Sequence, residues 1–194
     1  MNISLMILIA AALMTAGGIG ERTLYKIGIN KRNALIFFLG AAAMNGLIIE
    51  PNDEMAISAA CVYITVFTFG YSYAEKSEVG HRILLIPISV FIGAMSGMIS
   101  DGMNVIPVLA PAALSIIFGT GFGIASGGLI PVLDMIAAFI RTAAVEGYGF
   151  LSIGEECLVY QLSAVIISVF IKILFPNIRT IIRQKLYERT NKSI

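Results

Sequence analysis

The sequence predicts an all-α membrane protein, a polytopic bundle of about seven transmembrane helices with a basic amphipathic helix at its carboxyl end. Of its 194 residues 58% are hydrophobic and 13% are charged, whereas soluble domains average about 45–50% apolar and about 25% charged residues. The apolar residues form long runs, and the charges concentrate in the short loops between them. Loops that contain Lys or Arg alternate with loops that contain acids and no cation, which is typical of repeated membrane crossing.

The first predicted span covers residues 2–20. A secretory signal peptide carries Lys or Arg before its apolar core, whereas here the first cations, Arg22, Lys26, Lys31 and Arg32, follow the apolar run. We therefore expect a transmembrane helix with its amino terminus outside and the first loop in the cytoplasm.

The second predicted span, residues 34–49, contains the polar residue Asn45. Its expected role is a hydrogen bond to another helix, and the alternative is that it lines a solute path.

The acidic turn 50–54 follows and is expected outside, and residues 55–74 form the third span. The fourth, residues 83–100, comes after a loop with Lys76 and Arg82 that is expected inside.

The charge-free stretch between Asp101 and Asp134 is too long for one span, since a bilayer core of about 30 Å needs about 20 helical residues. We expect a fifth span at 105–118 and a sixth at 128–145, with a break at the glycines between them. A re-entrant hairpin over 105–133 is the alternative. This break could serve close helix packing or form an unwound segment of a transport path; its glycines are Gly119, Gly121, Gly123, Gly127 and Gly128.

The seventh predicted span covers residues 157–175, after an outside loop (146–156) with three acids and no cation. The chain thus divides into a membrane domain, 1–176, and a cytoplasmic tail, 177–194. In the tail, apolar residues at helical spacing alternate with cations, which predicts a helix lying on the anionic inner leaflet. The residues expected to contact that surface are Arg179, Arg183, Lys185 and Arg189.

Two charged residues, Asp134 and Arg141, fall inside the sixth span. They are two helical turns apart and project from the same face. A charged residue within a span usually faces the bundle interior, so the pair predicts a polar track along this helix. The alternative places Asp134 near the inner interface, with Arg141 extending to the outer one.

These features predict the passage of a small solute or ion through a helical bundle in the inner membrane. The alternatives are a structural subunit of a membrane complex and, least favoured, a membrane enzyme, because Asp101 and Asp134 are expected toward opposite faces. We expect no cofactor or metal, since Cys61, Cys157 and His81 have no zinc-site spacing. The two cysteines are expected as buried thiols, with a disulfide as the alternative.

With a net charge of +1 the chain has no basic surplus that favours nucleic acid as a partner. The expected partner is the bilayer with its anionic inner-leaflet lipids. A second copy of the chain or another membrane protein stays open as a further partner.

Three segments, beginning at Glu21, Ala110 and Leu151, resemble an uncharacterised family of prokaryotic multi-pass membrane proteins, the domain of unknown function 1614 type. They read ERTLYKIGINKRNALIFFLGAAAMNG, APAALSIIFGTGFGIASGG and LSIGEECLVYQLSAVII. Where that family has two aspartates, this chain has approximately Gly128 and Tyr160. The resemblance implies a polytopic membrane architecture and no activity.

Overall fold

The computed structural model describes residues 3–19, 21–26, 29–74, 79–99 and 105–174. The tail cations Arg179, Arg183, Lys185 and Arg189, and also Asp101, lie outside these ranges. The described part is mostly helical, in agreement with the predicted class. Its elements are α1 (Ile3–Ala16), α2 (Glu21–Lys26), α3 (Lys31–Met44), β1 (Ile48–Asn52), β2 (Met55–Ser58), α4 (Ala59–Ala74), α5 (Val79–Ile99), α6 (Ile106–Phe118), α7 (Thr120–Glu146), β3 (Leu151–Ile153) and α8 (Glu155–Leu174).

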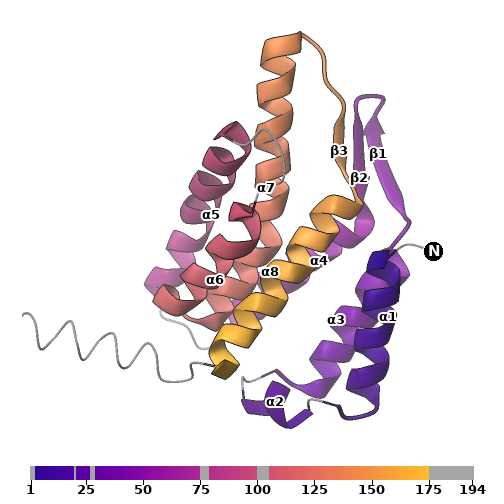
Figure 1. The fold of residues 1–194 in the computed structure, drawn as a ribbon, viewed down its shortest axis with the longest axis vertical. Helices are drawn as coiled ribbons and strands as arrows, with labels where there is room; N and C mark the ends of the chain where they lie inside the picture. The colour runs from indigo at the N-terminus through magenta and orange to yellow at the C-terminus, as the bar shows by residue number, and fades with distance from the viewer. Residues whose placement is uncertain (1–2, 20, 27–28, 75–78, 100–104, 175–194) are drawn as a thin grey trace, which may run out of the picture.

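Helix α7 is the centre of the fold, because α4, α5, α6 and α8 all pack against it (Figure 1). Its first half is buried almost continuously, from Thr120 to Gly128. An α-helix that is covered all round needs apolar or small residues on every side, and the glycine-rich sequence supplies them. The α1–α3 hairpin is attached mainly through contacts of α3 with α4.

The α6–α7 connection consists of Gly119 alone, with φ 110° and ψ 166°. This conformation strains residues that have a Cβ atom, so glycine permits the corner. Helix α6 then runs back along α7, and a Cβ atom on Gly123 would collide with Ser115 and with the Pro111 carbonyl oxygen. The predicted break is thus confirmed at Gly119 only.

The expectation of an unwound segment from 119 to 128 is wrong, because Gly121, Gly123, Gly127 and Gly128 all lie inside α7. Packing against neighbouring helices outweighs the low helix propensity of glycine, which costs about 1 kcal/mol per residue relative to alanine. The sixth predicted span therefore begins at Thr120 rather than at residue 128. Helices α6 and α7 form a tight helical hairpin at Gly119, and the alternative that residues 105–133 re-enter the membrane stays a prediction.

A small three-stranded sheet was not predicted. Strands β1 and β2 are antiparallel, and β2 pairs in parallel with β3, with Ile57 opposite Ile153. The predicted second span, 34–49, is therefore too long, since α3 ends at Met44 and β1 follows. The third, 55–74, begins with strand β2, and the loop 146–156 contains β3. Pairing over about a hundred residues of sequence leaves no local signal in strands this short.

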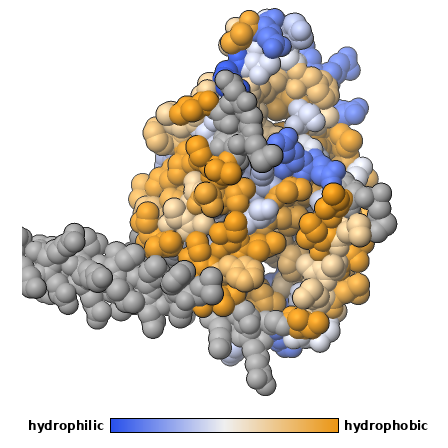
Figure 2. All heavy atoms as spheres, in the orientation of Figure 1, coloured by the Kyte–Doolittle hydropathy of each residue, from blue (hydrophilic) through white to orange (hydrophobic). Residues whose placement is uncertain are grey.

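Among the described residues, α7 is the one helix that is both long and apolar enough to cross a membrane. A buried core helix of a soluble protein would meet the same criterion. Several shorter helices are apolar too, over Ile3–Ala16, Ala59–Ser72, Ile83–Ile99 and Ile106–Phe118. In Figure 2 hydrophobic side chains cover much of the flank formed by the helices, and hydrophilic ones gather at the end where α7 and the strands lie.

The packing of α5 on α7 predicts a large cost for Gly97→Ala. The new Cβ atom would collide with the Asp134 carbonyl oxygen and with Ala137, and overpacking of this kind costs about 1–3 kcal/mol. Thermal unfolding in detergent should show a clearly lower midpoint for this variant.

The matched control is Gly70→Ala on α4, where no atom lies within 4 Å of the new Cβ. Its midpoint should stay the same or rise, because alanine favours the helix. Equal midpoints for the two variants would contradict the close α5–α7 contact.

Candidate functional site

The candidate site is a cavity of about 380 Å³ beside the second half of α7, close to β3 and the start of α8. We call it the Asp134 cavity. It combines charged, hydroxyl and aromatic side chains from α7, α8 and the loop between them, together with Gly97 of α5. Its lining residues are Gly97, Asp134, Met135, Ala138, Phe139, Arg141, Thr142, Gly149, Phe150, Leu151, Ser152, Glu156 and Tyr160.

Asp134 lies near the middle of α7, about 21 Å along the helix axis from Thr120 at 1.5 Å per residue. Its side chain is only 7% exposed. The helix begins at Thr120 rather than at residue 128, so Asp134 lies farther from the start of its helix than the sequence suggested, and its depth in a membrane stays a prediction. A carboxylate this deep in a bundle is costly unless it is solvated or paired, and the Asp134 cavity supplies polar surroundings.

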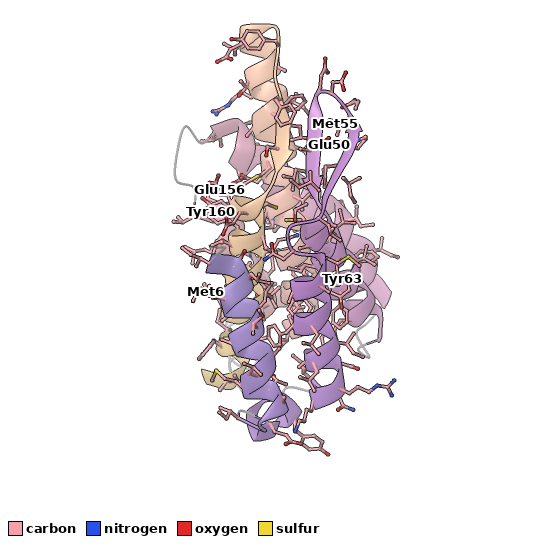
Figure 3. The ribbon with its side chains drawn as sticks, turned by 90° about the vertical axis from the view of Figure 1, so that its right-hand side faces the viewer. Met6, Glu50, Met55, Tyr63, Glu156 and Tyr160 are labelled. Carbon is pink, nitrogen blue, oxygen red and sulfur yellow. The ribbon has the colours of Figure 1, made fainter. Side chains whose placement is uncertain are left out.

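Arg141 lines the same cavity, so the structure brings together the two charges that the sequence placed on one helix face. Glu156 and Tyr160 of α8 complete the polar wall. The Tyr160 hydroxyl donates a hydrogen bond of 3.1 Å to Glu156 Oε1, and Figure 3 shows both residues one above the other on α8. Two carboxylates face one guanidinium, which makes the formal charge of the lining negative.

A second polar group, which we call the polar node, joins α4, α7 and α8 at the level of Gly128. The Gln161 side chain is fully buried. Its Nε2 lies 2.8 Å from the Gly128 carbonyl oxygen, 2.9 Å from Thr65 Oγ1 and 3.2 Å from the Cys61 carbonyl oxygen. The Thr65 hydroxyl in turn lies 2.9 Å from both carbonyl oxygens. The node therefore consists of Gln161, Thr65 and the carbonyl groups of Cys61 and Gly128.

The node lies close to Pro131, which is inside α7. Proline lacks an N–H and therefore gives no helical hydrogen bond to the carbonyl group four residues earlier, that of Gly127, which weakens the helix beside the node. The side chains of Thr65 and Gln161 donate to the neighbouring Gly128 carbonyl group on this turn. Among the described residues Gln161 Oε1 has no hydrogen-bond partner, so the node retains one unused acceptor.

Neither Gln161 nor Thr65 was singled out from the sequence, although a glutamine within an apolar run was a usable signal. Gly127 and Gly128 instead serve close packing here: a Cβ atom on Gly127 would lie 3.3 Å from Ala164 of α8, and one on Gly128 would collide with Thr68 of α4. Gly121 is buried in the same helix. These contacts agree with the packing interpretation of the glycine cluster.

Asn45 lies away from the Asp134 cavity. Its Nδ2 donates a 3.2 Å hydrogen bond to Ser4 Oγ of α1, which confirms the predicted bond between helices.

Cys61 and Cys157 are both buried free thiols, as expected. The described residues contain no group of three or more His, Cys, Asp and Glu side chains suited to a metal ion.

Comparison with family models, curated proteins and solved structures gave no match. The resemblance of the three quoted segments to an uncharacterised membrane family stays a prediction. Function is therefore argued from the geometry of the Asp134 cavity and of the polar node.

The shared hydrogen bonds of the node predict energetic coupling between Thr65→Val and Gln161→Met. Each change removes donors to the Gly128 carbonyl group, and neighbours in one network couple by about 0.5–3 kcal/mol. A double-mutant cycle measured by unfolding in detergent should therefore be non-additive.

The control cycle pairs Gln161→Met with Thr142→Val. The Thr142 hydroxyl donates to the Ala138 carbonyl group of its own helix and lies about 21 Å along α7 from residue 128. These two changes should be additive. Additivity in both cycles would mean that the node does not act as one network.

Proposed function

We propose that the chain is a seven-span membrane protein that passes a small solute or ion through its helical bundle. Each of the seven predicted spans overlaps one helix that is 13 residues or longer. Large apolar side chains are exposed on many of these helices, where a bilayer would cover them. Examples are Leu13, Leu39, Val66, Phe91, Ile117 and Phe170.

The sheet supports the proposed sidedness. The acidic segments 50–54 and 146–156 are both expected outside, and the pairing of β2 with β3 holds them together at one end of the molecule. The short helix α2, which belongs to the cation-rich first loop, lies at the opposite end (Figure 1). The parallel strands β2 and β3 lead directly into α4 and α8, so these two helices start on the same side, as the seven-span arrangement requires.

Reporter fusions test this topology. A fusion after Asp53 should give the signal of the outside compartment. A fusion at the carboxyl terminus should give the cytoplasmic signal, because the five helices from α4 to α8 would cross the membrane five times and leave the chain inside. Fusion after Lys76 supplies the matched inside control. The same signal after Asp53 and at the carboxyl terminus would exclude the arrangement.

The observation that carries the transport proposal is Asp134 itself, a buried carboxylate at mid-helix that opens into a polar cavity. Ionisable residues within a span commonly mark ion and proton paths. The cavity contains two carboxylates and one guanidinium, a balance that favours a cation or a proton over an anion. In the proposed orientation this cavity faces outside.

The polar node closes the path below the Asp134 cavity. The Gln161 side chain of the node is 0% exposed, so the described conformation is closed at this level. Passage requires Gln161 and Thr65 to separate from the Gly128 carbonyl group. Pro131 lies inside α7 at the same height, and its missing N–H leaves a helical hydrogen bond unmade, which is a common cause of helix kinks.

Asp134→Asn should abolish cation or proton flux and leave the fold intact, because asparagine keeps the size of the side chain and removes its charge and titration. The measurement compares purified full-length protein in liposomes, with H⁺, Na⁺ and K⁺ gradients in turn, for the original chain and the variant. If Asp134 has only a structural role, flux stays and stability falls, with partial recovery in Asp134→Asn combined with Arg141→Gln.

Two adjacent alanines, Ala137 and Ala138, test whether water reaches the Asp134 cavity from outside. Ala138 lines the Asp134 cavity, whereas Ala137 is 5% exposed and packs against Gly97. With Cys61 and Cys157 replaced by alanine, an impermeant maleimide added outside should label Ala138→Cys and spare Ala137→Cys. Protection of both positions would contradict an outward cavity and favour a structural subunit.

A further inference from the structure

Cys61 and Cys157 occupy equivalent positions in two matching strand–helix units, which read MAISAACV and LSIGEECL. Strands β2 and β3 pair in parallel, with Ile57 opposite Ile153. In both units the next helix, α4 or α8, begins two residues after this isoleucine, and the cysteine is its third residue. Because the paired strands lead into these two helices (Figure 1), the two cysteines lie at the same level of the bundle.

The two cysteine side chains meet in the interior. Cys61 is 1% exposed and Cys157 is 0% exposed, and both belong to the same hydrophobic core. Cys61 Sγ donates a hydrogen bond of 3.5 Å to the carbonyl oxygen of Gly154, immediately before α8. The two thiols also lie within hydrogen-bonding reach of each other. The two cysteines of the chain, far apart in sequence, are therefore neighbours in the fold.

We propose that Cys61 and Cys157 are a redox-sensitive pair, which an oxidant of the peroxide class converts into a disulfide bond between α4 and α8. One thiolate sulfur attacks a peroxide oxygen, the O–O bond breaks, and the sulfur becomes a sulfenic acid as hydroxide leaves. The other thiolate attacks the sulfenic sulfur, the S–S bond forms, and the S–O bond breaks as a second hydroxide leaves. The protons released by the two thiols convert both hydroxides into water, so one hydrogen peroxide molecule is reduced to two waters.

The Asp134 cavity gives a small oxidant access to the pair. Leu151 and Glu156 line this cavity, and Glu156 is the residue directly before Cys157. Asp134 and Glu156 both interact electrostatically with the Cys157 thiol. Hydrogen peroxide is small and uncharged, so it can reach the thiols from this polar space where a larger reagent cannot.

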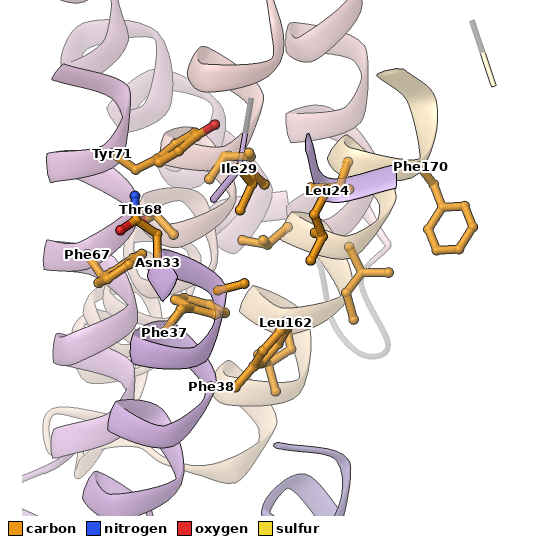
Figure 4. Close-up of a pocket in the computed structure, with 15 residues that line it drawn as sticks. Leu24, Ile29, Asn33, Phe37, Phe38, Phe67, Thr68, Tyr71, Leu162 and Phe170 are labelled. Carbon is orange, nitrogen blue, oxygen red and sulfur yellow. The ribbon is translucent and has the colours of Figure 1, made fainter. Parts of the chain in front are cut away.

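A disulfide at this point would tie α4 to α8 one turn from the polar node. Thr65 and Gln161 each lie four residues beyond the cysteine of their own helix, and Gln161 Nε2 also donates to the Cys61 carbonyl oxygen. Beyond the node an apolar cavity of about 190 Å³ lies between the two helices, where Tyr71 of α4 and Phe170 of α8 line it (Figure 4). The cysteine end is therefore the place where one covalent bond can hold α4 against α8.

The proposed function adds two supporting points. In the proposed orientation the cysteine pair lies at the outside end of the bundle, and disulfides persist in oxidising compartments outside the cytoplasm. Opening of the path requires Gln161 and Thr65 to separate from the Gly128 carbonyl group, and a disulfide one turn away would oppose this movement. These two points rest on the proposed function, whereas the contact between the thiols does not.

Thiol counting in the purified full-length protein in detergent tests the pair directly. The protein is treated with hydrogen peroxide, denatured, and labelled with a polyethylene glycol maleimide, which shifts the gel band once for each free thiol. The original chain should take up two labels before oxidation and none afterwards, should remain a monomer, and should regain both labels after dithiothreitol. Since the chain has two cysteines, this result identifies the bond.

The matched control exchanges two neighbouring residues of α4 by combining Ala60→Cys with Cys61→Ala. Ala60 is also fully buried, but consecutive residues of a helix point about 100° apart. This variant should keep both thiols under the conditions that oxidise the original chain. If it does not fold, Cys157→Ala with Ala164→Cys, two turns further along α8, replaces it. Persistence of both thiols in the original chain, or equal loss in the control, would overturn the proposal.

Thermal unfolding in detergent tests whether the bond ties the two helices together. The oxidised sample should unfold several degrees above the same sample after dithiothreitol, because the disulfide closes a loop of about a hundred residues in the unfolded chain. Dithiothreitol is added to Cys61→Ser as the control and should leave its midpoint unchanged. An oxidised midpoint equal to or below the reduced one would overturn the tie between α4 and α8. Neither measurement involves a bilayer or flux, so this proposal and the proposed function fail separately.

Discussion

The fold depends on the close approach of helix backbones to α7. Gly93 and Gly97 of α5 face the stretch from Ile130 to Ala138, and Gly123, Gly127 and Gly128 of α7 face α6, α8 and α4. At Gly97, Gly123 and Gly128 a Cβ atom would collide with a neighbouring helix. Small residues permit such contacts between apolar helices, where dispersion and weak hydrogen bonds accumulate over long interfaces. Helix α7 is thereby held on four sides, and its polar residues have fixed positions.

The central position of α7 explains why this one helix contributes both to the polar node and to the Asp134 cavity. Pro131 weakens α7 within one turn of Gly128, and the Gly128 carbonyl group accepts hydrogen bonds from Thr65 and Gln161. Less than two turns beyond Gly128, Asp134 lines a cavity that Arg141 and Glu156 also line. A buried amide network and a buried carboxylate this close together are costly in an apolar bundle, and Pro131 lies between them on α7.

The sequence by itself determined the helical class, the number and approximate position of the main helices and the residues Asp134, Arg141 and Asn45. These depend on hydrophobic runs and isolated polar residues, which are local properties of the chain. Tertiary structure alone decided that the glycines of α7 remain helical, that residues 48–58 and 151–153 form a sheet, and that Gln161 meets Gly128 and Thr65. The physical reason is that each of these outcomes depends on a partner far away in the sequence: burial overrides glycine propensity, strand pairing needs a distant strand, and a buried amide acquires its role from the carbonyl groups that it reaches.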